Sequence, residues 1–191
     1  MDLASILKIS GGVVALATYV PLILMAARSK GVGQSFATWL LWAMLDLTAT
    51  VSIVVQHGNF WLVLGFAIGS AAMAGLLLVQ GRRAWGRLES TVLALVLVCV
   101  SVWIFSGPKW ATVAATLALL LAGIPGMLEL WRNPQPDLAY VWLGFALANL
   151  LALLGGDDWS IEQRFAPGAL GLQSLTFLGI TCRRKPALPA R

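Results

Sequence analysis

The residues best suited to binding a polar molecule occur twice in this chain, in the same order. An aspartate in the first half and an asparagine in the second could hydrogen-bond the hydroxyl or amide groups of a solute. Each follows a tryptophan by seven residues, and a tryptophan ring offers a flat surface for stacking. The repeated pattern comprises Pro21, Arg28, Trp39 and Asp46, then Pro125, Arg132, Trp142 and Asn149. The equal spacing indicates a duplicated unit.

Seven apolar stretches must position these residues. The composition is 59% hydrophobic and 11% charged, with a mean hydropathy of +0.85, whereas soluble domains carry about 25% charged residues. The length of 191 residues leaves room for about seven membrane spans of roughly 20 residues and no further domain. The spans must be helices, because lipid offers no partners for backbone polar groups. We predict them at residues 5–27, 36–56, 60–80, 89–107, 110–131, 138–156 and 165–182.

Four of these spans carry a polar group near mid-depth, so we predict a solute site there. An ionisable side chain at the bilayer centre costs at least about 2.5–3.5 kcal/mol on insertion scales, which marks Asp46 as a functional candidate. In this interpretation the polar residues hold hydroxyls or an amide, while Trp42 and Trp142 stack on the solute. The predicted polar residues are Asp46, Asn149, Ser70, Gln173 and Ser174.

Structural roles for the same residues stay open. Asp46 could be protonated and hydrogen-bonded to a neighbouring helix through Thr18, Tyr19 or Ser70. Asn149 and Gln173 could join helices, which typically contributes only about 0.6 kcal/mol per contact. The tryptophans could pack toward lipid instead of lining a path.

The matched prolines predict a mechanical role. Pro21 and Pro125 each remove a backbone donor and loosen a helix near one end. Bending at both positions would close one end of a path while the other end opens. A static kink is the alternative.

The positive charges predict an orientation. Basic residues gather in the connectors after the first and third spans and in the C-terminal tail, which places the N-terminus outside and the C-terminus in the cytoplasm. This bias and anionic lipid explain the net charge of +5, so nucleic acid is not a predicted partner. No cofactor, metal site or catalytic motif emerges, and Cys99, Cys182 and His57 lack the spacing of metal ligands. We therefore do not expect an enzyme.

An odd number of spans between two three-helix units makes those units parallel, related by an axis along the membrane normal. A proline late in the first helix of each unit, a basic residue at that helix's end, and an aromatic-rich second helix with a central polar residue are similar to the PQ-loop superfamily. The 3+1+3 layout resembles its two-repeat SWEET-type sugar transporters. The namesake Pro-Gln is absent, however, because Pro21 precedes Leu22 and Pro125 precedes Gly126.

A second resemblance competes with the first. The run from Trp39 through Trp42 to Asp46 fits the W-x-x-W-x-x-x-(N/D) pattern of PnuC-type vitamin-precursor transporters. That family carries the pattern in its second repeat, and this chain carries it in the first. SWEET-type transporters place an Asn in each third helix, where this chain has Ser70 in one unit and Gln173 in the other.

Together these observations predict an all-α integral membrane protein of seven helices. We predict a first repeat at 1–81, a linker helix at 82–108, a second repeat at 109–184 and a cytoplasmic tail at 185–191. The expected function is facilitated alternating-access transport of a small polar solute, with a sugar as first choice. Vitamin-precursor transport, proton coupling through Asp46, and a non-transporting PQ-loop receptor or assembly role stay open. We expect a bacterial inner membrane protein that needs no second copy, although an oligomer is not excluded.

Overall fold

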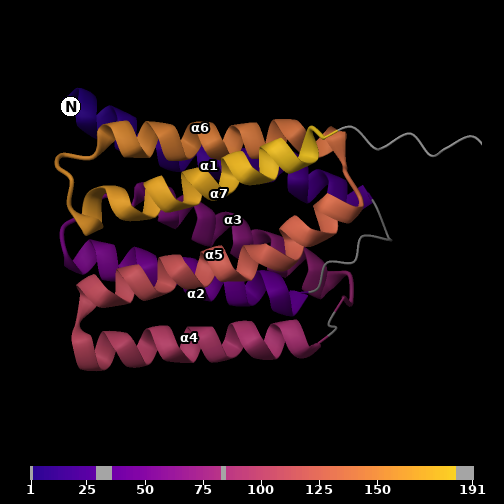
Figure 1. Cartoon of the computed structure of the whole chain (residues 1–191), viewed down its shortest axis with the longest axis horizontal. Coiled ribbons are helices and arrows are strands. Elements are labelled where there is room, and N and C mark those ends of the chain that lie inside the picture. Colours follow the sequence, from indigo (N-terminus) through magenta and orange to yellow (C-terminus); the bar gives the residue numbers. More distant parts are fainter. Residues whose placement is uncertain (1, 29–35, 83–84, 184–191) are drawn as a thin grey trace, which may run out of the picture.

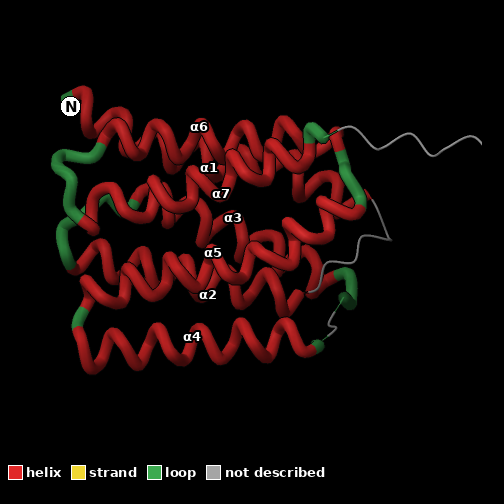
Figure 2. The backbone as a smooth tube through the Cα atoms, viewed as in Figure 1, coloured by secondary structure: helices red, strands yellow, loops and turns green. Residues whose placement is uncertain are grey.

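A computed structural model describes residues 2–28, 36–82 and 85–183 of the chain, and this part is almost entirely helical (Figure 1). Within it there are seven α-helices, a short 3₁₀ turn at Pro136–Leu138 and a π turn at Ile161–Phe165, and Figure 2 shows no strand among them. Each predicted span overlaps one helix, so the prediction of seven helices in an all-α chain is confirmed for the described residues. The helices are α1 (Leu3–Arg28), α2 (Phe36–Val55), α3 (Trp61–Val79), α4 (Arg87–Ser106), α5 (Pro108–Arg132), α6 (Ala139–Gly155) and α7 (Ala166–Thr181).

Five of the helices are long and apolar enough to cross a membrane, as expected for a helical membrane protein. They are α1, α2, α3, α5, and α6 together with the turn before it, while the apolar part of α4 and the whole of α7 are shorter. The outward-facing side chains are also apolar, since Leu47, Leu121 and Leu172 are each more than half exposed. Such a surface suits lipid, and exposed hydroxyls such as those of Ser101 and Thr176 bond to carbonyls of their own helices.

The helices do not pack in chain order. Helix α3 contacts both α1 and α2, and α7 contacts both α5 and α6. The largest contact between the two halves joins α1 to α6, and a second joins α2 to α5. Helix α4 lies at the edge of the bundle, where it packs on α2 and α5 (Figure 1). If α1, α2 and α3 are matched to α5, α6 and α7, the contact of α1 with α6 therefore corresponds to the contact of α5 with α2.

Two adjacent glycines allow α1 to lie between α3 and α6. A Cβ atom on Gly12 would lie 2.4 Å from the carbonyl oxygen of Trp61 on α3. A Cβ on Gly11 would lie 2.9 Å from the carbonyl oxygen of Ala148 on α6. Small residues at such positions let helix backbones approach closely, and dispersion contacts between backbones then hold membrane helices together.

The connectors alternate between the two ends of the bundle. The N-terminus and the connectors α2–α3, α4–α5 and α6–α7 lie at one end, which we call the N-terminal end, and the connector α5–α6 lies at the opposite end (Figure 1). Residues 29–35, 83–84 and 184–191 lie outside the described residues. They include most of the basic residues behind the orientation prediction and the whole predicted tail.

Candidate functional site

Asp46 lies in the buried core and contacts the residue that the sequence placed at the same depth. Its side chain is 3% exposed, and the Ser70 hydroxyl on α3 donates a long hydrogen bond of 3.4 Å to Asp46 Oδ2. The Tyr19 hydroxyl on α1 lies 3.0 Å from Ser70 Oγ. Three helices thus contribute one hydrogen-bonded chain, Tyr19–Ser70–Asp46. This is the arrangement that the structural interpretation of Asp46 anticipated, and it also forms a polar centre inside the first half.

Asn149 makes the corresponding contact in the second half. Asn149 Nδ2 donates to the Phe145 carbonyl at 2.8 Å and lies 3.5 Å from the Ser174 hydroxyl on α7. The residue is 1% exposed, and its Oδ1 has no hydrogen-bond partner within the described residues. A buried acceptor without a partner is costly, which makes this oxygen a natural position for a donor from a bound solute.

The two polar pairs occupy matching places in the repeat. Ser70 and Ser174 are separated by the same offset as Pro21 and Pro125, and Asp46 and Asn149 by the offset of Trp39 and Trp142. Each pair joins the second and third helices of its half at nearly equal distance. The main chemical difference is an acid in one half and an amide in the other.

Beside each polar pair, a large side chain fills the space between the first and third helices. This side chain comes from the first helix in one half and from the third helix in the other. In the first half, Tyr19 on α1 packs on Gly69 of α3, where a Cβ would lie 2.2 Å from the ring. In the second half the positions that match these two are Gly123 on α5 and Gln173 on α7, and a Cβ on Gly123 would lie 2.0 Å from Gln173 Nε2. The space between the first and third helices is thus filled from opposite sides in the two halves.

Gln173 uses its amide to join helices. Its Nε2 lies 3.2 Å from the Leu120 carbonyl and 3.4 Å from the Leu119 carbonyl, both on α5. Leu119 and Leu120 lie six and five residues before Pro125 on α5. In this conformation the amide N–H of Gln173 is therefore engaged by the protein.

A continuous aromatic cluster lies between the two halves. Phe145 on α6 contacts Tyr19 at 5.2 Å and Phe66 at 5.5 Å between ring centroids, so a residue of the second half packs into the first. Edge-to-face contacts of this kind favour aromatic pairs beyond their buried area. The members of this aromatic cluster are Tyr19, Trp39, Trp42, Phe66, Trp142, Phe145 and Phe177.

Trp142 is the member that most resembles a solute-stacking residue. Its ring lies parallel to that of Phe177 at 3.9 Å between centroids, with 6° between the planes. Its Nε1 is buried and has no hydrogen-bond partner within the described residues. Trp142 and Asn149 lie two turns apart on α6, so one face of this helix presents an unpaired donor and an unpaired acceptor.

The prolines lie where the sequence predicted them, inside helices. Pro21 is within α1 and Pro125 within α5. Pro125 is followed by Gly126, where a Cβ atom would lie 3.5 Å from the Phe177 ring. A proline and a glycine in succession weaken a helix locally, and bending at this point stays a prediction.

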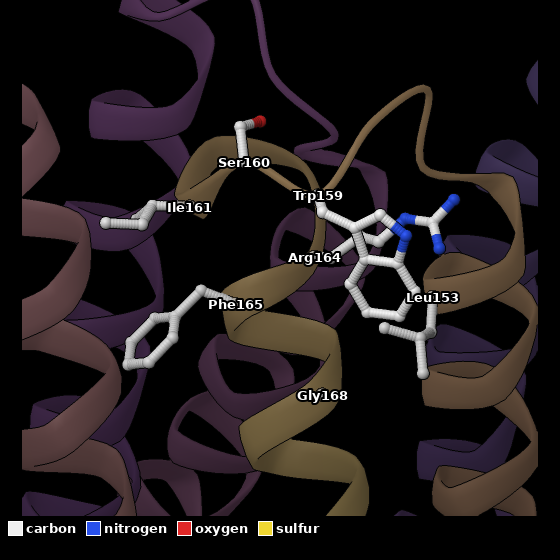
Figure 3. Close-up of a pocket in the computed structure, with 7 residues that line it drawn as sticks. All are labelled: Leu153, Trp159, Ser160, Ile161, Arg164, Phe165 and Gly168. Carbon is white, nitrogen blue, oxygen red and sulfur yellow. The ribbon is translucent and has the colours of Figure 1, made fainter.

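Two hollows lie between α6 and α7, on one side of the bundle. The first has a volume of about 310 Å³ and is lined by the seven residues in Figure 3. The second, of about 220 Å³, is lined by Asn149 together with apolar residues, and it shares Leu153 and Gly168 with the first. The second hollow therefore borders Asn149, whose side chain is itself buried.

Sequence reasoning missed several residues that contribute to this region. Phe145 was not singled out, although it occupies the repeat position that matches Trp42. Phe177 and the hollow beside Arg164 gave no sequence signal, because both depend on how α7 packs against α5 and α6. The described residues bring together no group of three His, Cys, Asp or Glu side chains that could hold a metal.

Comparison with known proteins gives no assignment: no family model, no curated protein and no solved structure matches this chain.

Proposed function

We propose that this chain is a PQ-loop-type transporter in which two parallel three-helix units, α1–α3 and α5–α7, are joined by α4. The packing supports this layout, since the third helix of each half contacts the other two and the contact of α1 with α6 corresponds to that of α5 with α2. A rotation about an axis along the membrane normal relates units arranged in this way. The transported molecule is a small polar solute, with a sugar as first choice.

The observation that carries the proposal is the matched pair of buried polar contacts. Asp46 with Ser70 and Asn149 with Ser174 lie at equivalent positions of the two units. An unpaired buried polar atom costs about 1–3 kcal/mol, so hydrogen bonds from a bound solute to Asn149 Oδ1 and Trp142 Nε1 would be favourable. One hydroxyl of a solute could accept from Trp142 Nε1, and a second hydroxyl of the same solute could donate to Asn149 Oδ1.

The hydrogen bonds between the units are stronger at the N-terminal end than at the opposite end, where the Tyr140 hydroxyl on α6 donates a weak bond to the Met25 sulfur on α1. At the N-terminal end, the backbone N–H of Asn59 donates to the Glu162 carbonyl at 3.0 Å, and Asn59 Nδ2 donates to the Ala152 carbonyl at 2.9 Å. These bonds join the two units at that end. Bending at Pro21 and Pro125, which lie toward the opposite end, would then admit the solute there, while the aromatic cluster separates the two sides. With the predicted orientation, that opposite end faces the cytoplasm of a bacterium.

The direct test is counterflow in proteoliposomes preloaded with members of a panel of sugars. We expect saturable exchange of one sugar class, reduced about fivefold or more in Asn149→Ala, because about one to three kcal/mol of hydrogen bonding to the solute is lost. Thr176→Ala is the matched control, since this exposed hydroxyl bonds only to the Leu172 carbonyl of its own helix. No exchange of any compound by well-folded protein would refute transport and favour a receptor or assembly role.

A vitamin precursor is the second candidate, favoured by the Trp142–Phe177 stack. Two parallel rings mark a position where the flat ring of a nicotinamide or thiamine-like compound could replace one partner. The same liposomes loaded with such compounds separate the candidates.

Proton coupling through the Tyr19–Ser70–Asp46 chain is tested in the same liposomes. An imposed pH gradient would drive uptake in the parent protein and fail to do so in Asp46→Asn. One copy contains both units, so exchange should persist in liposomes that hold a single copy each.

A further inference from the structure

The hollow at the N-terminal end of α7 has a polar end and an apolar end. Its polar end is formed by Arg164, whose guanidinium carbon lies 4.3 Å from the Trp159 ring centroid. Arg164 Nη2 donates to the Gly156 carbonyl at 2.7 Å, and its Nε has no partner within the described residues. Figure 3 shows Trp159 and Arg164 beside each other on the Leu153 side of the hollow. A cation is thus held at the bundle surface by a ring and one carbonyl.

The apolar end continues as a groove along both helices. The second hollow extends the first past Gly168 and Gly171 on α7. It runs from Leu153 to Ala146 on α6, a distance of about 10 Å at the rise of an α-helix. Its rims are exposed leucines, with Leu150 at 49% and Leu172 at 69%. An apolar groove that faces outward from a membrane bundle and ends at a cation near the surface fits an amphiphile.

The charges beside Arg164 decide the type of headgroup. The α6–α7 connector carries Asp157, Asp158 and Glu162 against the single Arg164. Lys8 on α1 pairs with Asp157, which still leaves an acidic excess. Asp158 is fully exposed, and hydrogen bonding from Ser160 lowers its pKa, so it is ionised at neutral pH. An anionic headgroup would meet net repulsion here, whereas a headgroup with both a phosphate and an ammonium would be matched by Arg164 and Asp158.

We propose that the groove between α6 and α7 is a binding site for phosphatidylethanolamine. The phosphate binds Arg164, the ammonium binds Asp158, and one acyl chain lies in the groove over Gly168 and Gly171. The lipid would close the α6–α7 face beside Asn149. This site stands independently of the proposed transport, because it concerns only the lipid-facing side of the second half.

The test is native mass spectrometry of the purified protein, titrated with phosphatidylethanolamine, phosphatidylcholine or phosphatidylglycerol of the same acyl composition. We expect one tightly retained phosphatidylethanolamine and weaker retention of the other two. Gly168→Leu should abolish that binding, because a Cβ there has only Leu153 nearby, at 3.8 Å, and a larger side chain would fill the groove without a backbone clash. Arg164→Gln should weaken it about tenfold or more through loss of a charged hydrogen bond to phosphate.

Two variants provide matched controls. Gly179→Leu adds the same side chain to α7 at a position where a Cβ meets nothing within 4 Å. Arg183→Gln removes an arginine that likewise stacks on a tryptophan, Trp131, and bonds to a carbonyl, yet lines neither hollow. Both should retain the lipid. Equal loss in the controls, stronger retention of phosphatidylglycerol, or unchanged binding in Gly168→Leu would each overturn the proposal.

Discussion

The contact between Tyr19 and Gly69 gives the sharpest test of the packing beside the candidate site. A Cβ on Gly69 would lie 2.2–2.5 Å from three atoms of the Tyr19 ring. The ring is 4% exposed, and it is held by the Ser70 hydroxyl and by the rings of Trp39 and Phe145. It cannot move aside without breaking one of these contacts.

We therefore expect Gly69→Ala to lower the free energy of unfolding by about 1–3 kcal/mol, the usual cost of overpacking a core. In a Tyr19→Ala background the added methyl meets no ring, and the same change should become neutral or stabilise by up to about 1 kcal/mol through helix propensity. The coupling between the two sites should then be about 1–4 kcal/mol. A Tyr19→Phe background keeps the ring and should keep the full penalty.

The assay is reversible unfolding in mixed micelles of increasing sodium dodecyl sulfate content, followed by tryptophan fluorescence. Gly75→Ala on the same helix is the control, since a Cβ there meets nothing within 4 Å, and it should be neutral or stabilise by up to about 1 kcal/mol through helix propensity. If Gly69→Ala behaves like Gly75→Ala, or if its cost is unchanged in Tyr19→Ala, the inferred contact is wrong.

Three further changes have defined outcomes. Asn59→Ala should lower the free energy of unfolding by about 1–3 kcal/mol, because the buried Ala152 carbonyl loses its donor; an unchanged unfolding curve would contradict this. Lys8→Gln should cost less than about 1 kcal/mol, since its partner Asp157 is half exposed, and the difference from the parent should shrink in high salt. Pro125→Ala should slow solute exchange without weakening solute binding if α5 bends there; equal exchange rates would leave a static kink.

Helix positions could be predicted closely from this sequence, because lipid imposes a strong constraint. A membrane span needs about 20 apolar residues with all backbone bonds made internally, so the apolar runs alone mark the seven helices. The sequence also predicted polar side chains near the centres of four spans, and Asp46, Ser70, Asn149 and Ser174 are all buried. Ser70 was one of three partners considered for Asp46, and this contact occurs, whereas the contact of Ser174 with Asn149 was not predicted.

The arrangement of the helices within the membrane plane could not be predicted in the same way. The position of a residue in an apolar run indicates its depth in the membrane, but it does not indicate which neighbouring helix the residue contacts. An apolar helix is compatible with lipid or protein on every side. The insertion of Phe145 between Tyr19 and Phe66, and the bonding of Gln173 to α5, follow from the rotation of each helix against its neighbours.

The sequence by itself determined that this protein is a bundle of apolar helices with a duplicated pattern and polar residues at matching depth. Only the tertiary structure decided that the third helix of each half contacts the other two, that Trp142 and Asn149 keep unpaired polar atoms, and that a groove opens between α6 and α7. The physical reason is that hydrocarbon fixes position along the membrane normal through transfer free energy. Position within the membrane plane depends instead on close packing at small residues such as Gly12 and Gly69.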